Sequence, residues 1–166
     1  MLTARLTKQT RKLSLPLAIA LLCLASACQT LGPLPPFNLK EPGWTVREGQ
    51  AVYRRNRTAP DIAGEILVAT RPDGSSFVQF TKAPFPLMIA RTTATSWELQ
   101  VPTQNSRYSG RGRPPARILL LALPRALAGQ PLPKNLSWRA DANGWHLENR
   151  KTGESLEGFF GNGVME

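Results

Sequence analysis

SWELQV, residues Ser96–Val101, alternates apolar and polar side chains more clearly than any other segment of the chain. Successive side chains of an extended strand point to opposite faces, so Trp97 and Leu99 are expected to share one face. Glu98 and Gln100 then share the other. This alternation is typical of a strand with one buried face, and it favours an antiparallel sheet.

The segments on either side of SWELQV show the same short alternation, broken by residues that form turns. Arg71-Pro72-Asp73-Gly74 suits a tight turn, because proline presets the first turn position and glycine tolerates positive φ. Asn143-Gly144 favours a second hairpin for the same reason. We therefore expect strands at residues 45–53, 62–70, 75–82, 87–92, 96–101, 137–142, 144–149 and 155–160, with a frayed glycine-rich end beyond them.

One segment favours a helix, from Pro115 to about Leu127. Pro114 and Pro115 suit its entry and Gly129 suits its end, whereas Pro124 predicts a kink or an early stop. Its leucines cover more than one side, so we expect the helix to be largely buried against the sheet. The predicted fold class is mainly β (α+β): an antiparallel sheet with one Leu-rich helical segment packed on it.

Residues 1–27 have the three parts of a secretory signal peptide. Four basic residues precede an apolar run, Leu13–Leu24, that is shorter than the roughly 20 residues of a membrane-spanning helix. The run ends in Leu24-Ala25-Ser26-Ala27-Cys28, which resembles the lipobox of bacterial lipoproteins. That resemblance implies cleavage before Cys28 and lipid attachment to its thiol. The alternative is ordinary signal peptidase cleavage, which leaves Cys28 as an unmodified terminal thiol.

The lipobox also implies where the mature chain is placed. Cys23 would leave with the signal, so a single cysteine remains and no internal disulfide can form. Gln29 is not the aspartate associated with inner-membrane retention, and we therefore expect a lipid anchor in the outer membrane, on its periplasmic face. Residues 28–41 are rich in proline and predict a tether that reaches rather than folds. Residues 42–166 are enough for one domain.

The residue types that most catalytic sites need are scarce. His146 is the only histidine, and it has no cysteine or second histidine nearby in the sequence to complete a metal site. There is no Gly-x-Ser-x-Gly motif to present a nucleophile. The acidic residues are scattered and indicate no specific carboxylate pair. We therefore predict no enzymatic activity, no metal and no cofactor.

The mature chain is moderately basic, with 17 Lys and Arg (21 less the four of the signal) against 11 Asp and Glu. Arg107, Arg111 and Arg113 lie in a glycine-containing tract that superficially resembles an RNA-binding segment. Because export argues against nucleic acid, we expect this tract to bind anionic headgroups or an acidic protein partner. The alternative is a solvated loop that leads into the helix.

The order of elements from Trp44 to Phe160 resembles that of the LolA/LolB-like periplasmic lipoprotein carriers. The resemblance is carried by the successive strands up to Val101, by the segment Arg107-Tyr108-Ser109-Gly110, and by the single Leu-rich helical insertion before the last hairpins. The lipobox favours the LolB side of the family, whose members are themselves lipoproteins. The resemblance implies a curved half-barrel, or incomplete β-barrel, whose concave face binds the acyl chains of lipids or lipoproteins. It also implies a soluble periplasmic carrier as a possible partner.

The resemblance yields a set of candidate lining residues for that concave face. For each of them, the alternative is an ordinary place in the hydrophobic core. Phe77 and Phe80 have opposite parity in one strand, so only one of them can face the ligand. Phe85 lies between two prolines and is expected at an exposed, membrane-touching tip. The full set is Phe77, Phe80, Phe85, Trp97, Leu99, Leu120 and Leu123.

Two functional interpretations follow, and they differ in one structural feature. A lipid-binding protein needs an unfilled concave face. A structural or assembly lipoprotein has a filled core and binds an envelope protein through an edge or through its basic tract.

Overall fold

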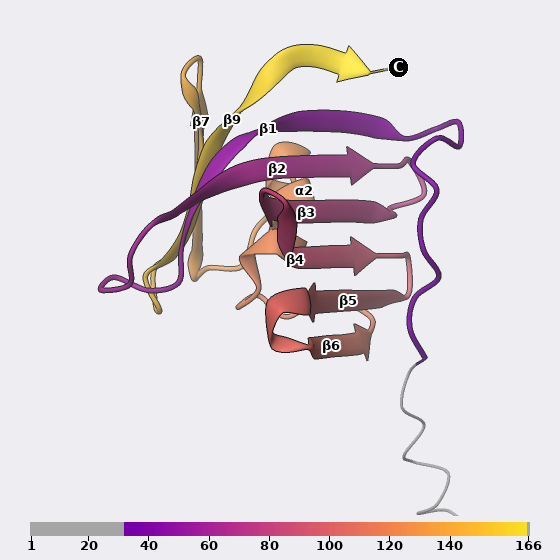
Figure 1. Ribbon diagram of the computed structural model, residues 1–166, viewed down its shortest axis with the longest axis horizontal. Helices are drawn as coiled ribbons and strands as arrows, with labels where there is room; N and C mark the ends of the chain where they lie inside the picture. The colour runs from indigo at the N-terminus through magenta and orange to yellow at the C-terminus, as the bar shows by residue number, and fades with distance from the viewer. Residues whose placement is uncertain (1–31, 166) are drawn as a thin grey trace, which may run out of the picture. The chain divides into compact units, whose positions relative to one another are not determined.

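The strands join into one open antiparallel sheet, drawn in Figure 1 from the computed structural model, which describes residues 32–165. The strand order is β6-β5-β4-β3-β2-β1-β9-β8-β7, so β6 and β7 are the two edges. The predicted mainly β fold class is confirmed. The bounds are β1 (Thr45–Arg54), β2 (Ile62–Thr70), β3 (Ser76–Lys82), β4 (Phe85–Thr92), β5 (Ser96–Val101), β6 (Ser106–Arg111), β7 (Leu136–Asp141), β8 (Gly144–Asn149) and β9 (Glu154–Met165).

Helix α2 (Leu119–Leu127) connects β6 to β7 and packs on one side of the sheet, which we call the inner face. It begins four residues later than predicted, after the prolines, and it contains Pro124. The expected burial of the helix is confirmed, because seven of its nine residues are buried. The core therefore lies between α2 and the inner-face residues of strands such as Val68, Phe80 and Leu147.

The sheet bends along a row of small residues on its inner face. Ala51 of β1 lies opposite Gly64 of β2 on one side and Gly158 of β9 on the other. A Cβ at Gly64 would lie 2.4 Å from the carbonyl oxygen of Thr81, and one at Gly158 would lie 2.2 Å from that of Gln50. Backbones approach this closely only where glycine replaces a side chain, so the row permits the strong curvature of β1, β2 and β9 in Figure 1.

One strand was not predicted from the sequence, and two predicted strands are extended by two or more residues. The basic tract forms strand β6, because a short 3-10 turn (Pro102–Gln104) and Asn105, at φ +48°, reverse the chain onto β5. β4 begins at Phe85, since that residue already pairs with Lys82. β9 extends through the glycine-rich end to Met165, where pairing with β1 replaces the expected fraying.

The segment that precedes β1, residues 33–44, lies on the outer face, opposite α2, and we call it the N-terminal strap. The carbonyl of Leu34 accepts a hydrogen bond from Arg91, and its N–H donates one to the buried carboxylate of Glu98. Near the other end, the ring of Trp44 contacts that of Phe37 and lies under the Arg71 guanidinium. The strap contains no helix or strand, which agrees with the predicted tether. From residue 34 onwards, however, it is bound to the sheet and does not extend freely. Cys28 and the predicted signal peptide lie outside the described residues.

Candidate functional site

Most of the predicted lining residues belong to the core. Phe80, Leu99, Leu120 and Leu123 are buried between α2 and the sheet, so α2 fills that part of the inner face. Trp97 is half-buried and packs against the same core, where Gly110 leaves room for its ring.

The two remaining candidates lie elsewhere. Phe77 faces outward, because Phe80 and Val78 define the inner parity of β3; the prediction that the two phenylalanines diverge is confirmed. Phe85 is 66% exposed at the end of the β3–β4 hairpin, which confirms the expected exposure but not a contact with membrane.

An unfilled space remains on the inner face beside α2, with a volume of about 820 Å³, and we call it the inner hollow. It lies between the C-terminal half of α2 and the ends of β1 to β4 nearest the β2–β3 and β4–β5 turns. Its apolar floor is formed by Val68 of β2 and by Leu121, Pro124 and Leu127 of α2. The first three of these are buried, so the hollow reaches the edge of the core.

Four arginines line the mouth of the inner hollow: Arg47, Arg71, Arg113 and Arg125. No carboxylate is among its lining residues. Arg71 donates to the Pro42 carbonyl and lies 3.7 Å from the Glu41 carboxylate, and Arg125 donates to the Pro131 carbonyl at 2.8 Å. The mouth is therefore strongly cationic.

Hydroxyl groups continue the polar lining from the arginines toward the sheet. Ser76 and Thr92 lie opposite each other on β3 and β4, both buried, and share a hydrogen bond. Thr45, Thr70, Ser75 and Thr93 line the same hollow. The hollow thus combines an apolar floor with cationic and hydroxyl groups, which suits a ligand with a chain and a polar head.

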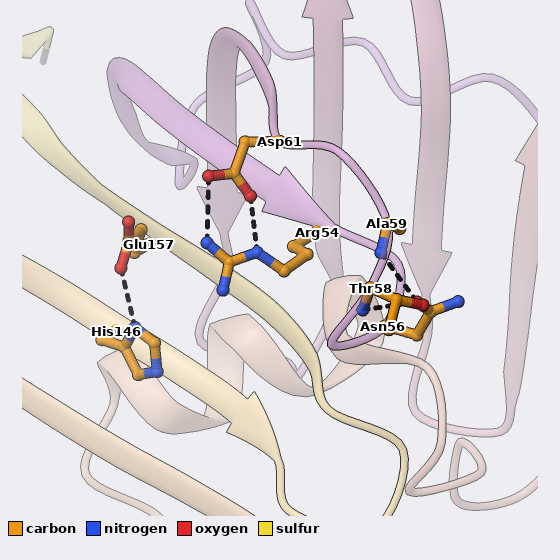
Figure 2. Close-up of polar contacts among 7 residues, drawn as sticks. All are labelled: Arg54, Asn56, Thr58, Ala59, Asp61, His146 and Glu157. Carbon is orange, nitrogen blue, oxygen red and sulfur yellow. Dashed lines mark hydrogen bonds and ion pairs between the residues drawn. The ribbon is translucent and has the colours of Figure 1, made fainter.

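A second concavity, about 760 Å³ in volume, lies on the outer face where the sheet bends, and we call it the outer groove. Its charges are mixed, because its lining includes three acidic residues, Glu65, Asp141 and Glu157, and two basic residues, Lys82 and Arg139. Figure 2 shows His146 of β8 pointing to Glu157 of β9, with Nδ1 3.0 Å from the carboxylate. Phe159, 51% exposed, adds an apolar side chain.

The polar pairs around the outer groove serve the fold. Arg54, at the end of β1, donates two hydrogen bonds to Asp61 before β2 (Figure 2). The pKa of the Asp61 carboxyl is lowered because the Arg54 hydrogen bond favours its charged form. Asn56 caps the turn between these strands by accepting from the Thr58 and Ala59 amides. These contacts hold the β1–β2 turn and the β8–β9 pair in place.

The structure separates the three arginines predicted to act together. Only Arg113 lines the inner hollow; Arg107 donates to the Glu98 carboxylate at 2.8 Å, and Arg111 is exposed on β6. Sequence reasoning missed Arg47, Arg71 and Arg125. A usable signal existed for Arg125, because residues 99–140 contain seven basic residues and no acidic one. Arg47 and Arg71 reach the hollow only through strand pairing.

A half-buried pair joins the end of β1 to the start of β9. The Tyr53 hydroxyl donates to the Glu154 carboxylate at 2.9 Å. Burial raises the pKa of the Glu154 carboxyl above its ordinary value, although the Tyr53 hydrogen bond opposes the shift. Burial and the nearby Glu154 charge also raise the pKa of Tyr53. Neither residue lines the inner hollow or the outer groove, so the pair connects β1 to β9.

Across residues 32–165, no three side chains of His, Cys, Asp or Glu gather as a metal site would require. In the same range no helix is long and apolar enough to cross a bilayer. No family model matches the chain, and no curated protein matches it. The two concavities are therefore the candidate binding sites of the described residues.

Proposed function

We propose that this protein is an outer-membrane lipoprotein, anchored through Cys28 on the periplasmic face, that binds acyl chains of lipids or lipoproteins in the inner hollow. The observation that carries the proposal is the apolar floor of Val68, Leu121 and Leu127 in an unfilled space of about 820 Å³. Small-molecule sites range from about 300 to 1,000 Å³. The inner hollow therefore has room for an alkyl chain.

The geometry also limits how the chain binds. α2 fills the centre of the inner face, so an acyl chain lies along the C-terminal half of the helix rather than beneath it. Each methylene that leaves water contributes roughly 0.8 kcal/mol. The curved sheet with its crossing helix supports the likeness to LolA/LolB-like carriers, and a periplasmic carrier is the proposed protein partner. Under this proposal the protein catalyses no reaction, takes no cofactor and binds no nucleic acid.

Native mass spectrometry of the Cys28→Ser chain, purified from cells, tests the hollow. We expect a stoichiometric acyl lipid that organic solvent extracts. Ala128→Trp should expel it, because Ala128 is exposed at the hollow and a large ring there fills the space. The matched control is Ala63→Trp, at an equally exposed position in the outer groove. A chain that is empty and also takes up no added acyl probe would contradict the proposal.

The anchor is tested separately, with the two cysteines as a matched pair. Radiolabelled palmitate should enter the chain, and Cys28→Ser should abolish the label and release the protein from the membrane fraction. Cys23→Ser should change neither, since that residue is proposed to leave with the signal peptide. Unchanged labelling of Cys28→Ser would disprove the lipid anchor.

A second candidate is a structural or assembly lipoprotein that binds an envelope protein. The outer groove favours it, because Phe159 is exposed there among mixed charges. A photocrosslinker at Ala63 should then capture a specific protein in cells, and one at Ala128 should not. The reverse outcome would exclude the outer groove as the interface.

A further inference from the structure

The two concavities differ in the charges of their lining residues, and this difference indicates the kind of ligand. The outer groove is lined by both acidic and basic side chains, whereas the inner hollow has four arginines and no carboxylate among its lining residues. We infer that the ligand of the inner hollow is an anionic amphiphile whose phosphate or carboxylate group is bound at the arginine-lined mouth, by Arg47 or Arg113. This inference rests on the proposed acyl-binding function and adds the chemistry of the headgroup.

Arg47 is placed beside the floor of the hollow by strand pairing. It lies directly opposite Val68 in the β1–β2 ladder, so both side chains leave the sheet on the inner face. Val68 is buried and Arg47 is exposed, which sets an apolar surface next to a solvated guanidinium. A chain resting on Val68 therefore has its head within reach of Arg47.

Arg113 approaches the hollow from a different element. It follows Gly112, whose φ of +73° turns the chain away from the end of β6 toward α2. Within residues 32–165, the guanidinium groups of Arg47 and Arg113 make no hydrogen bond or ion pair. Both guanidinium groups can therefore bind a ligand without breaking an existing contact. Guanidinium groups bind phosphate and carboxylate through two parallel hydrogen bonds.

The other two arginines add charge but are already engaged. Arg71 is held by the Pro42 carbonyl and stacked on Trp44, and Arg125 by the Pro131 carbonyl. Glu41, 3.7 Å from Arg71, partly offsets the charge of that arginine. These contacts fix the positions of two positive charges at the mouth, and both charges attract an anion.

The test compares three ligands on the Cys28→Ser chain by calorimetry: dodecyl phosphate, 1-dodecanol and inorganic phosphate, with the amphiphiles below micelle formation. Dodecyl phosphate uses both the floor and the arginines, so it should bind at least about tenfold more tightly than either of the others. The double variant Arg47→Gln, Arg113→Gln should lose about tenfold or more for dodecyl phosphate and nothing for dodecanol. Arg139→Gln, in the outer groove, is the matched control and should change neither affinity.

Each alternative outcome has a distinct meaning. Equal affinity for dodecanol and dodecyl phosphate would overturn the headgroup inference and leave the proposed function standing. No binding of either would overturn both. Inorganic phosphate binding as tightly as dodecyl phosphate would indicate an anion site without a chain, and an equal loss in Arg139→Gln would indicate nonspecific attraction; both would overturn the inference.

Discussion

The backbone N–H of Leu34 donates a hydrogen bond of 3.1 Å to the carboxylate of Glu98, 64 positions further along the chain. Glu98 is fully buried on the outer face and also accepts from Arg107 and Gln100. The strap therefore ends on β5, next to the edge strand β6.

The Glu98 cluster gives the first prediction. Glu98→Ala removes the acceptor of Leu34 and leaves Arg91 and Arg107 without their shared carboxylate. Removing one partner of a buried ion pair typically costs about 3 kcal/mol or more in the free energy of unfolding. Urea denaturation should show that loss, together with faster proteolysis within residues 33–44. Glu48→Ala, at an exposed position on the same face, is the control. If both variants lowered the free energy of unfolding by the same small amount, the structural role of Glu98 would be contradicted.

Glu154 gives a prediction about pH. Burial raises the pKa of its carboxyl in the folded protein above the ordinary 4.5, so the fold favours the protonated form. The stability that this group contributes is complete below pH 4.5 and is lost as the pH rises through the folded pKa. Glu154→Gln stays neutral and can still accept from Tyr53. It should match the parent at pH 4 and exceed it in urea midpoint at pH 8. A deficit at pH 8 would contradict the prediction, and Glu65→Gln, which is exposed, serves as the control.

The bend of the sheet predicts that alanine is tolerated at one glycine of β9 and destabilising at another. A Cβ at Gly158 meets the Gln50 carbonyl at 2.2 Å, whereas the nearest atom to one at Gly161 is 3.8 Å away. Gly158→Ala should therefore lower the free energy of unfolding by about 3 kcal/mol, and Gly161→Ala should change it by less than about 0.5 kcal/mol. Thermal denaturation followed by circular dichroism measures both. Similar values for the two variants would argue against close packing at the bend.

The exposed side chain of Phe85 gives a prediction about binding of the β3–β4 hairpin to a membrane. Because its ring is 66% exposed, Phe85→Ser should leave stability within about 0.5 kcal/mol. Burial of a phenylalanine contributes about 1.5 kcal/mol or more, so the variant should bind phospholipid vesicles about tenfold more weakly in a sedimentation assay. Phe159→Ser removes a similarly exposed ring from the outer groove and should bind as the parent does. Equal binding by all three proteins would exclude an inserted tip.

Much of the fold could be predicted from the sequence, because alternation and turn residues are local signals. SWELQV, the Arg71–Gly74 turn and the Asn143-Gly144 hairpin all lie where the pattern placed them. β6 was missed because arginine, serine and glycine are typical of loops, and only its pairing with β5 makes it a strand. The late start of α2 follows from its two entry prolines.

The candidate site was less predictable, because apolar patterning identifies buried residues without distinguishing a core from a cavity. Phe80 and Leu120 fill the centre of the inner face, and they therefore belong to the hydrophobic core, which was the alternative to lining a cavity. The inner hollow is formed instead by Arg47, Val68 and the end of α2, which are far apart in the sequence. Their proximity depends on strand register and on the crossing of α2, neither of which is a local property.

The most direct test of the proposed function is to map where an acyl chain touches the protein. A diazirine-labelled fatty acid is added to the Cys28→Ser chain, activated by light, and the modified peptides are sequenced by mass spectrometry. Binding in the inner hollow predicts labels in residues 62–70 and 119–128, from β2 and α2, and their loss in Ala128→Trp but not in Ala63→Trp. Labels confined to residues 139–146 and 157–159 of the outer groove, or labels unchanged by Ala128→Trp, would contradict it.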